Sequence, residues 1–167
     1  MNNNLLIIGA GGHGRVVKET AEAVKGFGKI DFLDDKAGIA IGRCEDYKKF
    51  IQDYKYAFAA LGNNELRAKW FKLLTDEGYD LPVLIHPAAY VSPSAAVEDG
   101  TIIGAKAVIN TNSSIGLGCI ISIGALVDHD CTVGEFSHIN LGAIIKSGCK
   151  FGSFEDLDAG EVFSGGE

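Results

Sequence analysis

The second half of the chain repeats every six residues, and this repeat constrains the fold more than any other feature. Every sixth residue is apolar through twelve successive hexads, and eleven of the twelve are β-branched. These residues are Ile85, Val91, Val97, Ile103, Ile109, Ile115, Ile121, Val127, Val133, Ile139, Ile145 and Phe151. A soluble α-helix repeats at about 3.6 residues and a half-buried strand at about 2, so neither explains this period. An ordinary Val/Ile-rich sandwich would have to keep the phase through twelve hexads by accident.

A second register of small residues lies four positions after each apolar one. It runs Ala89, Ala95, Thr101, Ala107, Ser113, Cys119, Ala125, Cys131, Ser137, Ala143 and Cys149, and Glu155 interrupts it. The two registers predict a solenoid of very short strands, in which three hexads make one triangular coil and twelve make four coils. Because the small register stops at Glu155, we expect coils over residues 85–156 and a tail or cap over residues 157–167.

The first 84 residues follow different rules and alternate between strand and helix patterns. Apolar runs predict strands at 5–9, 29–35, 56–62 and 81–85, and the segments between them predict helices within 10–26, 47–54 and 63–78. This alternation is typical of a small parallel α/β domain over residues 1–84. The charge divides at the same place. Residues 1–84 hold 12 basic and 12 acidic residues, whereas residues 85–167 hold 3 and 10, which accounts for the net charge of −7.

The charge and the cysteines exclude several classes of partner and site. An acidic second half with three lysines argues against nucleic acid and against an anionic membrane surface. No apolar run approaches the ~18 residues that span a bilayer, and the opening MNNNLLIIGAGG lacks the basic region of a signal peptide. We therefore expect a cytoplasmic protein with reduced cysteines. Cys119, Cys131 and Cys149 share the small register, which favours buried, unreactive thiols, and no metal site is expected.

A glycine-rich loop follows the first predicted strand. Gly9, Gly11 and Gly14 match the pattern G-x-G-x-x-G, and Asp34 comes twenty residues after Gly14. Backbone amides at a helix N-terminus attract an anion, and a carboxylate at the end of the second strand can bind ribose hydroxyls. The motif alone is compatible with a dinucleotide, a mononucleotide or a tight turn without a ligand. Since 84 residues supply about half of a doubly wound sheet, a mononucleotide fits better.

Taken together, the motifs GAGGHG, FLDD, ALGNNELR and IHP and the hexads resemble a known family over residues 5–152. The chain is similar to the sugar O-acyltransferases of the sialic acid O-acetyltransferase NeuD type and to the bacterial UDP-4-amino-sugar N-acetyltransferases. The resemblance implies a small Rossmann-like α/β domain followed by an all-β left-handed parallel β-helix that forms a homotrimer. It also implies transfer of an acetyl group from acetyl-CoA to an amino or hydroxyl group of a nucleotide-linked sugar.

The resemblance further implies roles for individual residues. Nucleotide-sugar binding falls to Gly11, Gly12, His13, Gly14, Asp34, Asp35, Gly62 and Asn63, and acetyl-CoA lies beside His138 and Gly142. His129 is implied as the general base, with Asp130 as its partner, and attack on the thioester is direct. An imidazole can take a proton from an attacking amine, and an adjacent carboxylate orients the ring and stabilises its charged form. His129 and His138 both fall outside the apolar and small registers, so we expect both to project from the coil.

Three features depart from the family pattern and keep a second function open. The hexads lapse after Phe154, where relatives continue for two further coils, and Ser122 stands where relatives often carry an asparagine that touches the sugar. The basic residues available for the phosphates of coenzyme A are few: Lys106, Lys146 and Lys150. The alternative is a non-catalytic trimer that binds a nucleotide-linked sugar and has lost the coenzyme A channel. A zinc carbonic anhydrase would need three converging histidines, and His86 lies too far back in the sequence to join the other two.

Overall fold

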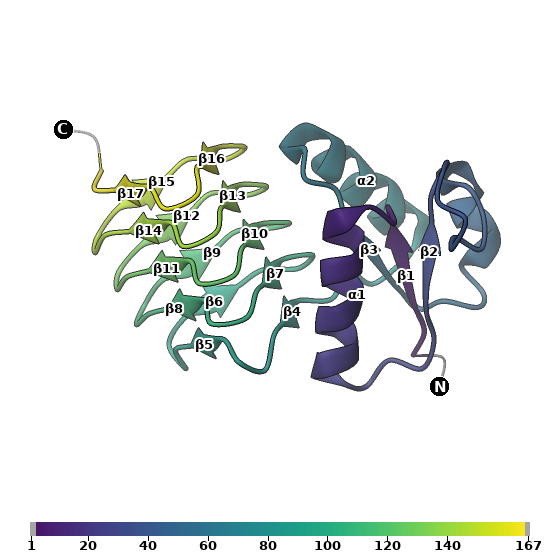
Figure 1. Ribbon diagram of the computed structural model, residues 1–167, viewed down its shortest axis with the longest axis horizontal. Coiled ribbons are helices and arrows are strands. Elements are labelled where there is room, and N and C mark those ends of the chain that lie inside the picture. The colour runs from purple at the N-terminus through teal and green to yellow at the C-terminus, as the bar shows by residue number, and fades with distance from the viewer. Residues whose placement is uncertain (1–2, 166–167) are drawn as a thin grey trace. The chain divides into compact units, whose positions relative to one another are not determined.

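The computed structural model describes residues 3–165, and the chain divides into two compact units, Met1–Pro82 and Val83–Glu167. The first unit is an α/β sandwich of short elements and the second is a solenoid (Figure 1). None of the described helices is long and apolar enough to cross a membrane.

The first unit alternates strands and helices as the sequence predicts. Its elements are β1 (Leu5–Ile8), α1 (Gly12–Val24), β2 (Ile30–Leu33), the 3₁₀ helix η1 (Cys44–Phe50), β3 (Tyr56–Ala59) and α2 (Asn64–Glu77). The three strands form a parallel sheet in the order β2-β1-β3, in which Leu5 pairs with both Ile30 and Tyr56. All four residues of β1 are completely buried. A central parallel strand is covered on both faces, which is why this strand is a continuous apolar run.

Two predicted elements of the first unit differ in the structure. The helix expected at 47–54 is instead η1, which begins at Cys44 and ends at Phe50. The strand expected at 81–85 is limited to β4 (Leu84–Ile85), which pairs with the solenoid strand β7 (Ile102–Ile103). Pro82 has no backbone N–H to donate to a ladder, which explains why the strand begins only after it.

The second unit consists, within the described residues, of fourteen two-residue strands arranged in three parallel sheets. We call these sheets the first face (β16-β13-β10-β7-β4), the second face (β17-β14-β11-β8-β5) and the third face (β15-β12-β9-β6). The strands not yet given are β5 (Tyr90–Val91), β6 (Ala96–Val97), β8 (Val108–Ile109), β9 (Ser114–Ile115), β10 (Ile120–Ile121), β11 (Leu126–Val127), β12 (Thr132–Val133), β13 (His138–Ile139), β14 (Ile144–Ile145), β15 (Lys150–Phe151), β16 (Asp156–Leu157) and β17 (Val162–Phe163).

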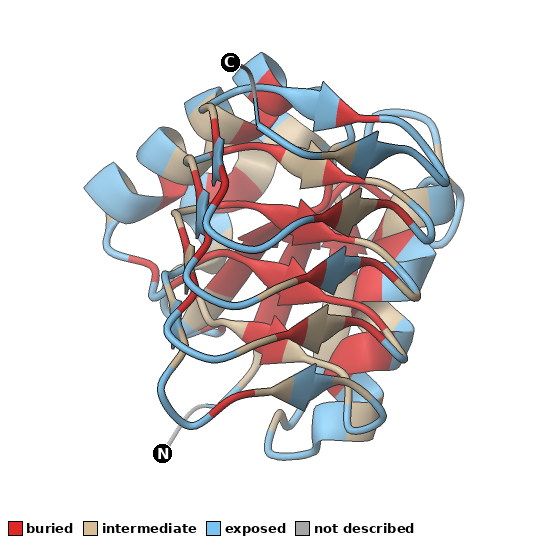
Figure 2. Cartoon of the chain, turned by 90° about the vertical axis from the view of Figure 1, so that its left-hand side faces the viewer, coloured by how far each residue is buried: buried red, intermediate tan, exposed pale blue. Residues whose placement is uncertain are grey.

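Neighbouring strands on a face are 18 residues apart in sequence, as in the pair Ile103 and Ile121, so three hexads make one coil. The apolar register forms the interior. Ile103, Ile109, Ile121 and Ile139 are completely buried, and the core appears as the red positions along the strands in Figure 2. The structure therefore confirms a parallel β-solenoid built from the hexads.

The solenoid continues past the point where the small register ends. Strands β16 and β17 pair with β13 and β14, and Leu157 and Phe163 extend the apolar register. Phe163 packs edge-on against Phe151, with ring centroids 5.1 Å apart. The structure thus differs from the tail or cap expected from residue 157. A small residue is required only where another coil stacks on it, and Glu155 is exposed because no described strand lies above it.

Candidate functional site

The loops that follow the three strands of the first unit meet at one edge of the sheet. Parallel strands place their carboxyl ends at the same edge, and the strand order reverses beside β1, where open α/β sheets bind ligands. The loops are joined by backbone hydrogen bonds. Gly9 N donates to Leu33 O (2.8 Å), and Ala60 N donates to Ile8 O (2.9 Å). The structure therefore brings together the segments that contain the predicted nucleotide-sugar residues.

The glycine loop has the conformation of an anion-binding turn. Gly9 has a φ of +99°, which disfavours a side chain, and a Cβ on Gly14 would overlap the carbonyl oxygen of Gly9. Gly11 caps α1 and supplies no side chain to its first amides, and the first turn carries no acidic residue. A Cβ at Gly11 or Gly12 would meet nothing within 4 Å, so the helix N-terminus is open. His13 also lies in this first turn. Such a helix end favours a phosphate.

Asp34 shapes this loop through both of its carboxylate oxygens. Its Oδ2 accepts a hydrogen bond from Ala10 N (2.9 Å), and its Oδ1 accepts from Lys36 N and Ala37 N (2.8 Å each). These three hydrogen bonds lower the pKa of Asp34 below its usual value. A carboxylate has about four lone-pair sites, so Asp34 retains acceptor capacity for a ligand hydroxyl.

Asp35 and Cys44 lie where the chain turns into η1. Asp35 Oδ1 accepts a hydrogen bond from Cys44 N (3.1 Å) and lies 3.8 Å from Arg43 Nε. Burial, and then the charges of Asp35 and Asp34, raise the pKa of the Cys44 thiol to about 11. Cys44 is therefore a thiol rather than a thiolate at neutral pH, and it is not a nucleophile for this site.

The loop after β3 is held by Arg67, a residue that the sequence analysis did not single out. Asn63 caps α2, with its Oδ1 accepting from Leu66 N (2.8 Å). The Arg67 side chain is buried, and its Nη1 donates to Leu61 O (2.9 Å) and Gly62 O (3.1 Å). A buried guanidinium that donates to consecutive carbonyls fixes the path of the backbone at Gly62 and Asn63. The signal was present in the segment NNELR, where the arginine follows the cap by one helical turn.

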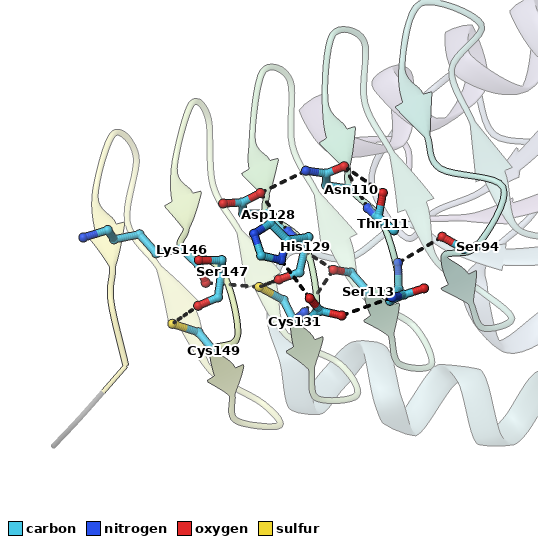
Figure 3. Close-up of polar contacts among 12 residues, drawn as sticks. Ser94, Asn110, Thr111, Ser113, Asp128, His129, Cys131, Lys146, Ser147 and Cys149 are labelled. Atoms are coloured by element: carbon cyan, nitrogen blue, oxygen red, sulfur yellow. Dashed lines mark hydrogen bonds and ion pairs between the residues drawn. The ribbon is translucent and has the colours of Figure 1, made fainter.

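The second candidate site lies on the solenoid, in the turn between β11 and β12 (Figure 3). His129 Nδ1 lies 2.8 Å from Asp130 Oδ2, and roughly half of each side chain is exposed. The hydrogen bond with Asp130, and then the charge of Asp128, raise the pKa of His129. Asp130 has a φ of +58°, a left-handed conformation that aspartate tolerates better than most residues. The carboxylate thus holds Nδ1 and leaves Nε2 as the nitrogen that can take up a proton.

Two asparagines in the preceding coil hold the carboxylates on either side of His129. Asn110 Nδ2 donates to Asp128 Oδ1 (2.9 Å), and Asn112 Nδ2 donates to Asp130 Oδ1 (3.2 Å). Both hydrogen bonds contribute to lowering the pKa of their aspartates. Each asparagine precedes its aspartate by 18 residues, which is one coil. The repeat length could have identified them, but the sequence analysis missed them.

A hollow of about 240 Å³ lies on the second face beside this turn. Its lining combines apolar side chains of three successive strands with polar residues at the strand ends: Val108, Leu126, Val127 and Ile144, and Asn110, Asp128 and Lys146. A mostly apolar hollow with a few polar groups at its edge is typical of a small-molecule site. Lys146 stands one coil after Asp128 and is the hollow's only basic lining residue.

The two residues predicted beside acetyl-CoA lie elsewhere on the solenoid. His138 is the outward residue of β13 on the first face, and Gly142 (φ +63°) lies in the turn between the first and second faces. His129 lies in the turn between the second and third faces. The fold of one chain therefore places His129 and His138 at different parts of the coil. Among residues 3–165, no group of three or more His, Cys, Asp or Glu side chains is arranged to hold a metal ion.

The sequence matches characterised proteins over much of its length. Residues 4–74 match the PglD N-terminal domain family. The chain is 35% identical over 112 residues to the UDP-N-acetylbacillosamine N-acetyltransferase of Bacillus subtilis (strain 168). That alignment covers 61% of this chain and 51% of the relative, so the chain spans about half the length of this curated relative.

Solved structures extend the similarity to both units and to the left-handed β-helix. The acetyltransferase domain of PglB from Neisseria gonorrhoeae FA1090 is 32% identical, with a TM-score of 0.79, and the match covers 98% of this chain and 92% of that domain. PerB from Caulobacter crescentus, solved in complex with CoA and GDP-perosamine, is also 32% identical. Its TM-score is 0.82, and the match covers 97% of this chain and 89% of that protein.

Proposed function

Because the chain belongs to the family of sugar acetyltransferases with hexapeptide repeats, we propose that it transfers an acetyl group from acetyl-CoA to the amino group of a nucleotide-linked sugar. The family resemblance expected from the sequence is confirmed. The relatives named above include N-acetyltransferases, which favours an amine over a hydroxyl as the acceptor. The single observation that carries the proposal is the His129–Asp130 pair, 2.8 Å apart on an exposed turn.

His129 is the proposed general base. The neutral amine of the sugar attacks the thioester carbonyl, a C–N bond forms, and the C–S bond to coenzyme A breaks. His129 Nε2 takes the proton that the nitrogen loses, and the coenzyme leaves as its thiol after it gains a proton. Asp130 keeps the ring oriented through Nδ1 and stabilises its charged form. Asn112 in turn holds Asp130.

The first unit is the proposed site for the nucleotide portion of the acceptor. The open N-terminus of α1 at Gly11 and Gly12 suits the diphosphate. Asp34, Asp35 and Asn63 lie on the loops at the same sheet edge, and the Asp35 side chain is 53% exposed. Ribose hydroxyls and base edges need such acceptors, which is why these loops are proposed to select the nucleotide.

A homotrimer is part of the proposal. The outward residues of the second face form an apolar column: Tyr90, Val108, Leu126, Ile144 and Val162. Tyr90 is 54% exposed and Val162 is 57% exposed, and burial against a second copy would remove this surface from water. His129 and His138 lie at different parts of one solenoid, so a site that uses both draws them from neighbouring subunits.

The alternative of a non-catalytic binding trimer depended on the loss of coils after residue 155. Strands β16 and β17 occupy that segment and keep the parallel pairing of the solenoid. This continuity favours the enzyme, because the coil that follows the His129 turn is itself covered by a further strand on two faces.

The test is acetyl transfer by the purified protein with acetyl-CoA and a panel of nucleotide-linked 4-amino sugars. His129→Ala should lower turnover by about 10²–10⁴-fold, the usual contribution of a general base, and should leave nucleotide-sugar binding measured by calorimetry unchanged. Ser147→Ala, at the same turn position one coil later, is the matched control and should retain activity. Full activity in His129→Ala would refute the base assignment. No calorimetric signal with acetyl-CoA would refute the enzyme.

A further inference from the structure

Three polar side chains form a line on the first face of the solenoid, away from the His129 turn. Ser122 Oγ lies 2.9 Å from His138 Nε2, and His138 Nδ1 lies 3.8 Å from Asp156 Oδ1. A hydroxyl, an imidazole and a carboxylate in this order are the groups that activate a serine nucleophile, whatever the fold.

The coil geometry produces this line. His138 pairs in register with Ile120 on one side and Asp156 on the other, so strands β10, β13 and β16 lie side by side on the first face (Figure 1). Ser122 follows Ile120 by two residues and therefore lies on the same side as the outward residues of the face. Ser122 N donates to Ile139 O (2.9 Å), and His138 N donates to Glu155 O (2.9 Å). The backbone that carries the serine and the histidine is thus held by the ladder.

Solvent and a small substrate can reach these groups. The side chain of His138 is 19% exposed and that of Asp156 is 57% exposed, and Ser122 is partly exposed. The free cysteines of the solenoid are buried in the interior, so none of them competes as the nucleophile. Ser122 is therefore the hydroxyl nucleophile of this face that already has a base in contact.

We propose that Ser122, His138 and Asp156 form a second acyl-transfer centre, which takes an acyl group from a thioester and passes it to water. Ser122 Oγ attacks the thioester carbonyl, and the C–S bond breaks while His138 Nε2 takes the hydroxyl proton. That proton passes to the leaving sulfur, so the products are a free thiol and an acyl-serine. Water then attacks the ester, His138 takes a proton from it, and the acid and the free serine are released. Asp156 is a positioning residue that stabilises the charged imidazole.

This inference rests on the proposed function only for the identity of the thioester, acetyl-CoA. The chemistry of the centre itself does not require coenzyme A, because a serine activated by histidine also reacts with a simple activated ester. Two acyl donors therefore separate the two proposals. Acetyl-CoA tests the donor of the proposed function, and p-nitrophenyl acetate tests the serine alone.

The experiment measures thiol release from acetyl-CoA by the full-length protein with no sugar present, and nitrophenol release from p-nitrophenyl acetate. Ser122→Ala should lower both rates at least tenfold, and the wild-type protein should carry an acetyl group on Ser122 in peptide mass spectrometry after rapid acid quenching. Asp156→Asn should lower both rates less. Ser114→Ala is the matched control, because Ser114 is also an outward, partly exposed solenoid serine but its hydroxyl contacts Thr132 (3.4 Å) instead of a histidine. Its rates should equal those of the wild type.

The outcomes distinguish the two proposals. Loss of nitrophenol release in Ser122→Ala without any thiol release by the wild type would support the serine centre and contradict acetyl-CoA as the donor. Equal rates with both donors in Ser122→Ala and wild type would overturn the serine centre, and sugar acetylation would then be judged on the His129 variants alone.

Discussion

Substitution of Gly14 by alanine should destabilise the first unit, although alanine is the better helix former. Gly14 is buried in the first turn of α1, and an added Cβ would overlap the carbonyl oxygen of Gly9. It would also lie 2.9 Å from the Gly9 carbonyl carbon, where ordinary contacts begin at 3.4 Å, so the loop must retreat by at least 0.5 Å. The loop is held against such a shift, because Gly9 N donates to Leu33 O (2.8 Å) and Ala10 N to Asp34 Oδ2 (2.9 Å).

The expected loss follows from two opposing contributions. Overpacking of a close-packed contact costs about 1–3 kcal/mol, whereas replacing glycine by alanine inside a helix gains up to ~1 kcal/mol. We therefore expect Gly14→Ala to lower the free energy of unfolding of the first unit by about 1–2 kcal/mol. Gly12→Ala is the matched control in the same loop. A Cβ there meets nothing within 4 Å, so only the favourable contribution of about 0.4–1 kcal/mol remains.

Trp70 provides the assay. It is the only tryptophan of the chain, lies in α2 of the first unit, and packs edge-on against Tyr47 with centroids 5.5 Å apart. Its fluorescence therefore follows the unfolding of the first unit during a urea titration. With a slope of about 2 kcal/mol per molar urea, Gly14→Ala should lower the midpoint by roughly 0.5–1 M, and Gly12→Ala should raise it slightly. A Gly14→Ala midpoint equal to or above that of Gly12→Ala would refute the steric argument.

Three further predictions concern charge and assembly. Because Asp130 raises the pKa of His129 and a base works only when deprotonated, Asp130→Asn should move the acidic limb of the kcat/KM profile to lower pH while it lowers the plateau; an unmoved limb would contradict this. Leu126→Asp places a charge in the apolar column and should convert the trimer to monomers in sedimentation velocity; a monomeric wild type would contradict the trimer. The lowered pKa of Asp34 adds stability that is present above its ordinary value of 3.8 and is lost as the pH falls below it. Asp34→Asn should therefore be less stable than the wild type at pH 7 in urea titrations, and the difference should shrink towards pH 3.

Much of the fold follows from local pattern. The apolar register from Ile85 to Phe151 predicts the interior of the solenoid, because each of those positions must be removed from water in the same way on every coil. The apolar run of β1 and the glycine loop after it predict the α/β unit for a similar reason. The prediction was weakest at the ends of elements, as at η1 and at residues 157–163, where neighbours above or beside the segment decide its structure.

The sequence by itself determined the register of the hexads, the two-part organisation and the family, because these depend on residue types that recur at fixed spacings. Only the tertiary structure decided which polar atoms meet. The partners of Asp34 are backbone amides from two loops, and those of Asp128 and Asp130 are asparagines one coil away. The line from Ser122 through His138 to Asp156 spans three coils. Such contacts join residues that are distant in sequence, and they depend on strand register and turn geometry, which residue spacing constrains but does not by itself set.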